Sequence, residues 1–204
     1  YDKIKNILIA SNEVEIYDPK RDIIIYSDKI TYFKNNELIF TNGNSRAVDK
    51  DVEIEAVDFK YNKLSNIIYA KDDVKINNKK ENYLIYSDNV VFEKNSGKVF
   101  TRDNSKAISD GVFINAEIFN YDQNSKILNA KGNVKIDDTV ENIVIETNFI
   151  TYDRLNEKVF TQGKTKTFFE DEYEFNSKNV ILDRNLKELS SQNKSTIKDN
   201  NSNF

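Results

Sequence analysis

The side chains that could do chemistry in this chain are carboxylates, amines, hydroxyls and phenols. The 204 residues include no histidine and no cysteine, so there is no imidazole base, no thiol nucleophile and no usual zinc site. Glu170–Glu172 with Glu174 could chelate calcium, but the spacing matches no known calcium loop and favours a solvated edge. The pair Asp137-Asp138 falls in a turn between strands, where no cleft is implied for a glycosidase. We therefore predict a protein that is not an enzyme, with no catalytic residues, no cofactor and no metal.

The net charge of the chain limits the kinds of molecule that it could bind. The chain has 30 Lys and Arg against 34 Asp and Glu, for a net charge of -4, which argues against nucleic acid. Lys71, Lys75, Lys79 and Lys80 either meet lipid phosphates or keep an exposed edge soluble, and the second role is favoured. No apolar run approaches the roughly 18 residues that span a bilayer; Ile23–Tyr26 is typical of the longest runs.

An internal repeat dominates the sequence. Residues 1–16, 61–76 and 121–136 align with one another, and so do residues 32–47, 92–107 and 152–167. Residues 1–60 share 23 identities with residues 61–120 when they are aligned without gaps. The unit of 60 residues divides again into two similar halves, so each half-unit has about 30 residues.

Apolar residues alternate with polar ones inside each half-unit, which predicts strands with one buried face. Turn residues such as Asn42, Gly43 and Asn44 separate the runs. The third strand of each half-unit changes parity, because its buried positions step by three rather than two. A small residue stands beside that step, where a β-bulge or bend would let one strand serve two facing sheets: Ser27, Ala56, Ser87, Ala116, Thr147 and Ser177.

These patterns predict an all-β fold, an elongated stack of about seven three-strand repeats that form two antiparallel sheets folded toward each other. We expect one domain over residues 1–185. Residues 186–204 begin a further repeat that stops early, and we expect poor order there if its partner is missing.

Two recurring strings resemble the OstA-like domain of lipopolysaccharide transport. The first is Y-D-x-x-(x)-x-[IL]-x-A-x-[GD]-[ND]-V-x-I, best seen at residues 121–136. The second is I-x-[ST]-[DN]-x-[IV]-x-[YF], at residues 25–32, 85–92 and 145–152. The resemblance implies a β-jellyroll open along one side (a β-taco), whose members join end to end and share an apolar groove for the acyl chains. It also implies a periplasmic location associated with the outer membrane.

Within that family the break inside a repeat favours the N-terminal domain of the outer-membrane assembly protein (LptD-like). The free periplasmic bridge protein (LptA-like) is the alternative, and the absence of cysteines speaks for it. The implied partners are lipopolysaccharide, held by its acyl chains, and other jellyroll proteins of the bridge, bound through edge strands. An LptD-like chain would also meet the outer-membrane barrel and its plug lipoprotein.

The candidate groove lining is the set of apolar side chains that share the inward phase of the strands. It comprises Leu8, Val14, Ile16, Ile23, Ile25, Ile30, Ile39, Val52, Ile54, Phe59, Ile68, Val74, Ile76, Ile85, Val90, Phe92, Val99, Val112, Ile114, Phe119, Leu128, Val134, Ile136, Ile143, Ile145, Ile150, Val159 and Phe175. At any one of these positions an ordinary packing role is favoured over contact with lipid. The competing function is a structural β-repeat, such as an adhesin stalk, with a filled core.

Overall fold

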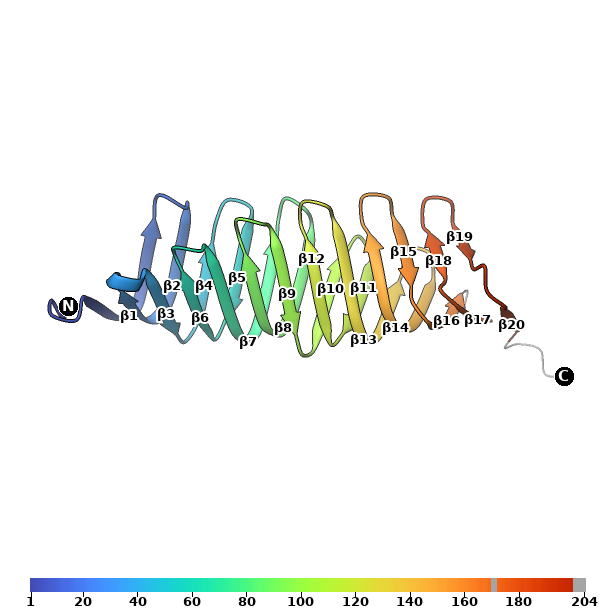
Figure 1. The fold of residues 1–204 in the computed structure, drawn as a ribbon, viewed down its shortest axis with the longest axis horizontal. Helices are drawn as coiled ribbons and strands as arrows, with labels where there is room; N and C mark the ends of the chain where they lie inside the picture. The colour runs from blue at the N-terminus through green and yellow to red at the C-terminus, as the bar shows by residue number, and fades with distance from the viewer. Residues whose placement is uncertain (170–171, 200–204) are drawn as a thin grey trace. The chain divides into compact units, whose positions relative to one another are not determined.

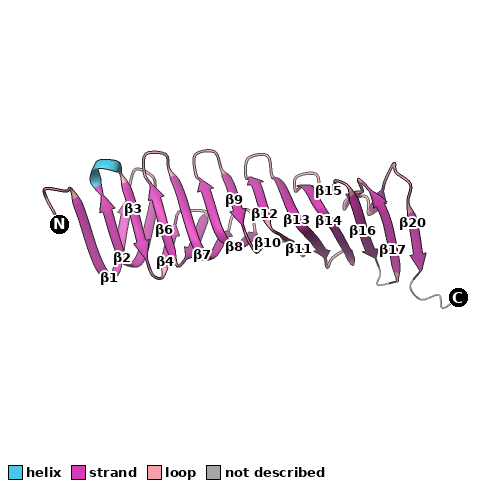
Figure 2. Ribbon diagram, turned by 60° about the horizontal axis from the view of Figure 1, so that its bottom comes forward, coloured by secondary structure: helices cyan, strands magenta, loops and turns pink. Residues whose placement is uncertain are grey.

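Antiparallel β-strands make up most of the computed structural model, which describes residues 1–169 and 172–199 (Figure 1). The described residues contain twenty strands and one short 3-10 helix, η1 (Lys34–Asn36), drawn in cyan in Figure 2. No helix among these residues is long and apolar enough to cross a bilayer. The predicted all-β antiparallel class is confirmed, whereas the number of repeats stays a prediction.

The chain divides into two compact units, Tyr1–Arg102 and Asp103–Phe204. The single domain expected over residues 1–185 stays a prediction. Unit 1 contains β1 (Ile7–Asp18), β2 (Ile23–Phe33), β3 (Leu38–Asn42), β4 (Ser45–Val48), β5 (Val52–Ala56), β6 (Asp58–Asn62), β7 (Ile67–Asn78), β8 (Tyr83–Glu93) and β9 (Lys98–Arg102). Unit 2 contains β10 (Ser105–Ser109), β11 (Val112–Ala116), β12 (Ile118–Asp122), β13 (Ile127–Asp138), β14 (Ile143–Asp153), β15 (Lys158–Thr161), β16 (Lys164–Phe169), β17 (Tyr173–Lys178), β18 (Ile181–Asp183), β19 (Glu188–Ser190) and β20 (Thr196–Asp199).

Each long strand belongs to two sheets. In unit 1, residues 29–33 of β2 pair with β3, whereas residues 24–26 of the same strand pair with β4. β3 then pairs with β6, and β4 pairs with β5. The two halves of β7 pair with β6 and β5: residues 67–71 with β6, and residues 75–78 with β5. The unit therefore has two walls that share their long strands. The first wall holds β3, β6 and β9, and the second wall holds β4 and β5.

Unit 2 repeats this arrangement within itself. Its first wall holds β12, β15, β18 and β19, and its second wall holds β10, β11, β16, β17 and β20. The long strands β13 and β14 join the two walls. Both walls end in rows of turns. We call the turns at the free end of the first wall the first lip, and those at the free end of the second wall the second lip.

The walls meet at a corner where the strands change direction. Along β2 the buried positions are Ile25, Ser27 and then Ile30, which is the parity step that the sequence predicts. The extra residue, however, lies on the partner strand. Ser11 pairs with Lys29 and Val14 pairs with Ser27, so two residues of β1 face one residue of β2. The bulge thus lies in β1, and the same shift recurs in β7 and β13.

Small hydroxyl side chains satisfy the backbone at this corner. The Thr41 and Ser45 hydroxyl oxygens lie 2.6 Å apart, and the Ser45 hydroxyl donates to the Val57 carbonyl at 2.8 Å. The Phe59 N–H donates to Thr41 Oγ1 at 2.7 Å. A strand that leaves one wall for the other interrupts its ladder, and these hydroxyls replace the lost backbone partners. Polar residues are therefore buried at the corner for a structural reason.

Candidate functional site

The candidate groove residues lie between the two walls of each unit, with their side chains turned inward. Twenty-four of the 28 are buried. The other four, Leu8, Val14, Ile16 and Ile143, are half-buried. Three of these lie on β1, whose only strand partner among the described residues is β2, so one side of the strand is uncovered. Most side chains of this set therefore lie in the interior, whereas their role as the lining of a lipid groove stays a prediction.

One part of the interior of unit 1 is closely packed. A narrow space between the walls leaves no room for a water molecule. Its lining comes from both walls and from the rim: Ile23, Ala47, Val52 and Ile54 of the second wall, Ile68 and Phe92 of the first, and Asp49 and Lys94 at the lips. Apolar side chains from the two walls fill this part of the interior, and charged side chains lie at its edge.

In the described part of the chain, the buried polar side chains are hydrogen-bonded with one exception, which lies in unit 2. Thr167 is fully buried on β16, and its hydroxyl is the only buried side-chain polar atom without a hydrogen-bond partner in the described part of the chain. The sequence places alanine at the corresponding positions of the earlier repeats, Ala47 and Ala107. A buried hydroxyl without a partner carries a desolvation cost, so Thr167 departs from an otherwise uniform lining.

Ion pairs link the two lips of unit 1. Lys63 follows β6 on the first lip, and its Nζ lies 3.4 Å from Oδ2 of Asp18, the last residue of β1 on the second lip. Lys94 follows β8, and its Nζ lies 2.8 Å from Oδ2 of Asp49, which follows β4. The Lys94 and Asp49 side chains are 11% and 20% exposed. Each pair therefore closes the open side between the walls, which we call the mouth.

Unit 2 closes its mouth in the same way. Arg154 Nη2 donates to Ser109 Oγ at 2.8 Å and lies 3.8 Å from Asp110 Oδ2. Arg184 Nε donates to Asp138 Oδ2 at 2.6 Å, and these side chains are 11% and 1% exposed.

Beside the Arg184 pair, Lys187 Nζ lies 3.0 Å from Glu141 Oε2. We refer to these contacts, with Lys63–Asp18 and Lys94–Asp49 of unit 1, as the mouth bridges.

Only side chains join the lips. Each lip is tied to itself by backbone hydrogen bonds, such as Lys63 N–H to Glu37 O at 2.9 Å on the first lip and Lys79 N–H to Asp51 O at 3.0 Å on the second. Among the described residues no backbone hydrogen bond runs from one lip to the other. The mouth can therefore part without loss of any β-ladder.

The electrostatics keep the mouth bridges charged. Burial raises the pKa of Asp18, but the Lys63 ammonium, the Lys20 N–H and the Arg21 guanidinium together outweigh burial, and the net pKa lies below its ordinary value. Burial lowers the pKa of Lys63, but the hydrogen bond that its ammonium donates to Glu37 and the nearby charges reverse this, so the net pKa is raised. Arg184 behaves alike, because Asp138, Tyr152 and Glu157 together outweigh its desolvation and raise its pKa. These three groups are ionised at neutral pH.

The mouth bridges were not predicted from the sequence, although a signal exists. Lys63, Lys94, Arg154 and Arg184 occupy the same place in their half-units, two residues after an inward aromatic or leucine. Such a recurrence of cations could have been read from the alignment of the repeats.

The predicted lysine cluster lies elsewhere. Lys75 and Lys79 pair with Glu55 and Glu53 of β5, which belongs to the same wall. These two lysines form surface ion pairs on the second wall and do not reach across the mouth.

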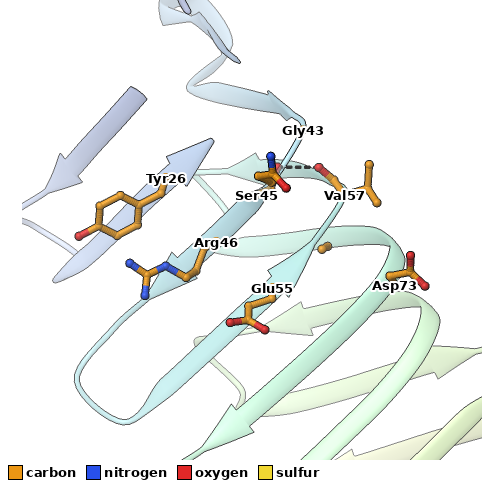
Figure 3. A pocket seen from close by; sticks show the side chains of 9 residues that line it. Tyr26, Gly43, Ser45, Arg46, Glu55, Val57 and Asp73 are labelled. Carbon is orange, nitrogen blue, oxygen red and sulfur yellow. Dashed lines mark hydrogen bonds between the residues drawn. The ribbon is translucent and has the colours of Figure 1, made fainter. Parts of the chain in front are cut away.

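A separate hollow of about 580 Å³ opens on the outer face of the second wall of unit 1 (Figure 3). There the Arg46 guanidinium lies 4.5 Å from the ring centroid of Tyr26 and 3.0 Å from Glu53. Glu55 and Asp73 line it as well. Its cation is already paired with a carboxylate, so the hollow offers no unpaired charge that would select a ligand.

The acidic cluster considered for calcium is only partly described. Glu170 and Asp171 lie outside the described residues. Glu174 lies 3.1 Å from Lys166 and 3.9 Å from Lys198, on neighbouring strands of its own wall. In residues 1–169 and 172–199 no group of three acidic side chains is placed to hold a metal ion.

Comparisons with known proteins agree with the motifs. A sequence model of the family described as OstA-like protein matches residues 74–200, more than half of the chain. A search of curated proteins gave no match. One similar solved structure is LptH, described as the LptA homologous periplasmic component of the conserved lipopolysaccharide transport device from Pseudomonas aeruginosa. It is 15% identical, covers 64% of this chain and 85% of its own, and has a TM-score of 0.43. A likeness at that level carries no argument about function.

Proposed function

Because the chain belongs to the OstA-like family, we propose that it is a periplasmic lipid-conduit module for lipopolysaccharide. The acyl chains lie between the two walls, and modules stack end to end to deliver the lipid to the outer membrane. The observation that carries this proposal is an apolar interior whose mouth, in residues 1–169 and 172–199, is bridged by side chains and by no backbone hydrogen bond. A guest can enter such an interior without breaking a sheet.

The lining suits a guest that slides. The candidate lining side chains are all aliphatic or Phe, so one half-unit offers a hydrocarbon chain much the same contacts as the next. Burial of one CH₂ group contributes about 0.8 kcal/mol, so a dozen methylenes contribute roughly 10 kcal/mol before any cost of opening. A uniform path holds the lipid firmly but gives it no direction. Net movement therefore requires an external source of energy.

The end of unit 1 offers a surface for stacking. β1 has one strand partner among the described residues, and its outward side chains Ile9 and Tyr17 are 58% and 54% exposed. An unpaired strand edge is a template for strand addition by another chain. The proposed partners are lipopolysaccharide and other jellyroll proteins of the bridge.

The resemblance also extends the proposal to the outer membrane. For an LptD-like chain the outer-membrane barrel and its plug lipoprotein are further partners. The LptA-like bridge protein stays the alternative.

The test is photo-crosslinking at matched aromatic positions. Benzoylphenylalanine replaces Phe92, which faces the interior at 4% exposure, and in a control it replaces Phe40, which is 37% exposed on the outer face of β3. Both proteins are irradiated with purified lipopolysaccharide. We expect a covalent adduct from position 92 and none from position 40. Labelling at position 40 alone would contradict the proposal.

A structural stalk is the second candidate, and the close packing between the walls around Ile23 and Phe92 favours it. A stalk needs its core only for stability, so neither crosslinker position should form a lipid adduct. The same experiment therefore separates the two functions.

A further inference from the structure

The mouth bridges stand in the path of any guest that has a polar head. A lipid whose tails lie between the walls must keep its head in water, so the connection between head and tails passes through the mouth. Lys94–Asp49 lies directly at the rim of the apolar space in unit 1, and both residues line it. A guest moving along the interior therefore meets each bridge in turn.

We propose, on the basis of the proposed function, that the mouth bridges form a clasp that opens for the lipid and closes behind it. The clasp determines how fast the guest enters and travels along the interior. Breaking a bridge costs no backbone hydrogen bond, because only side chains join the lips in the described part of the chain. The lips keep their own backbone ties, so each can move as a connected edge.

The regular spacing of the bridges supports this role. Lys63 and Asp18, Lys94 and Asp49, and Arg154 and Ser109 are each 45 residues apart. Arg184 and Asp138 are 46 residues apart, because the half-unit that contains β16 and β17 is one residue longer than the corresponding earlier one. Each unit therefore carries two such closures at the same place in its repeat. An ion pair that only stabilised the packing at one place in the fold would not have to recur at the same position in several repeats.

Burial gives the bridges enough strength to act as barriers. Exposed ion pairs contribute little because water competes for both partners. Arg184 and Asp138 are nearly inaccessible, and Lys94 and Asp49 are largely so. Removing one partner of such a pair has a larger effect than removing one partner of a surface pair such as Lys75–Glu55, whose side chains are 38% and 44% exposed.

The decisive experiment locks the mouth reversibly. Leu186 and Val140 lie on opposite lips of unit 2, beside the Lys187–Glu141 bridge, and are 69% and 59% exposed. Because the chain has no cysteine, the double variant Leu186→Cys, Val140→Cys can be joined by a disulfide-containing bismaleimide. Benzoylphenylalanine at the inward position Phe119 of unit 2 reports loading with lipopolysaccharide. A single-cysteine variant treated alike is the control.

We expect the locked protein to lose at least nine tenths of the adduct and to recover it when the linker is reduced. Recovery shows that the protein stayed folded. If the locked and reduced proteins load equally, the clasp is wrong and the lipid conduit stands. If neither these proteins nor the single-cysteine control forms an adduct, the conduit itself fails and the clasp fails with it.

A second experiment measures the barrier in unit 1. Asp49→Asn weakens a mouth bridge, and Glu55→Gln weakens the surface pair with Lys75 as a matched control. Uptake of lipopolysaccharide with a fluorescent acyl chain is followed by stopped flow. We expect roughly tenfold faster uptake for Asp49→Asn, the ratio that corresponds to about 1.4 kcal/mol of barrier, and less than about twofold for Glu55→Gln. Equal rates in the two variants would overturn the clasp.

Discussion

Replacing Asp138 with asparagine tests the strength of a mouth bridge with little change of shape. Asp138 Oδ1 accepts the N–H groups of Val140 and Glu141 at 3.1 and 3.2 Å, and Oδ2 accepts from Arg184 Nε at 2.6 Å. Asparagine can keep the Oδ1 contacts of the turn. It replaces Oδ2 by an amide that cannot accept from the guanidinium. The variant therefore removes the charge pair and retains the turn.

The expected loss follows from the burial of both partners. Breaking a buried ion pair by removing one charge costs about 3–5 kcal/mol. Arg184 keeps contacts with Glu157 and with the Tyr152 hydroxyl, so some of its charge stays compensated. We therefore expect Asp138→Asn to lower the free energy of unfolding by about 3 kcal/mol, the lower end of that range.

Asp183→Asn is the matched control. Asp183 is also buried, its Oδ1 accepts the Leu186 N–H at 3.1 Å, and its Oδ2 lies 2.9 Å from Lys158. Lys158, however, is 40% exposed and lies on the same wall, so water can solvate the ammonium that loses its partner. This variant should cost less than about 1 kcal/mol.

Urea denaturation at neutral pH, followed by circular dichroism, measures both losses. The midpoints and slopes are compared with those of the unmodified chain, because equal slopes are needed to convert midpoints into free energies. The reasoning is refuted if Asp138→Asn costs no more than Asp183→Asn. In that case the mouth bridge would be as weak as a surface ion pair and could not act as a barrier.

Three further predictions concern the interior, the lips and the corner. Thr167→Val should raise the free energy of unfolding by about 1 kcal/mol, because it removes a buried hydroxyl without a partner. Thr165→Val should lower the free energy of unfolding, because it removes the 2.6 Å contact with Thr161. Thermal melts of the two variants give the sign of each change. Asp18 has a lowered pKa in the folded state, so its contribution to stability is present above its ordinary pKa of 3.8 and is lost as the pH falls through the folded pKa. The stability difference between the wild-type chain and Asp18→Asn should therefore shrink between about pH 5 and pH 2 in melts. Gly132→Ala should destabilise unit 2 by more than Gly163→Ala does. Both glycines have a positive φ, but of these two only Gly132 lies where a Cβ would come within 3 Å of a side chain, that of Glu117. Denaturation midpoints measure both losses of stability, and equal losses would mean that backbone strain alone matters.

The fold could be predicted because the repeat samples one strand pattern many times. A single run such as Ile23–Tyr26 is too short to separate a strand from a buried helical turn. The same alternation at fixed spacing removes that ambiguity. The parity step at Ser27 also predicts the corner between the walls. The alternation of inward and outward side chains shifts by one residue where a strand passes from one wall to the other.

The bulge and the mouth could not be predicted in the same way. The step at Ser27 shows that the two strands lose register, but the sequence does not say which of them holds the extra residue; in the structure it is β1. The partner of Lys94 lies 45 residues earlier, on the opposite wall. Which strand halves face each other depends on how far the walls fold together, and periodicity within one strand does not determine that angle.

A closed interior and a lipid-carrying role are compatible if the guest compensates for the packing that it displaces. When the walls part, their side chains exchange contacts with each other for contacts with the guest, so the gain comes from the apolar surface that the guest removes from water. A dozen methylenes contribute roughly 10 kcal/mol, whereas removing one partner of a buried bridge costs about 3–5 kcal/mol, which is an upper bound on the cost of opening it. A loaded module with one open bridge is therefore favourable. Within a unit, advancing the guest from one mouth bridge to the next opens one bridge and closes the other, so the free energy changes little while a barrier recurs at each bridge. The strength of the mouth bridges should then set the speed of transport, and the length of the acyl chains should set how firmly the lipid is held.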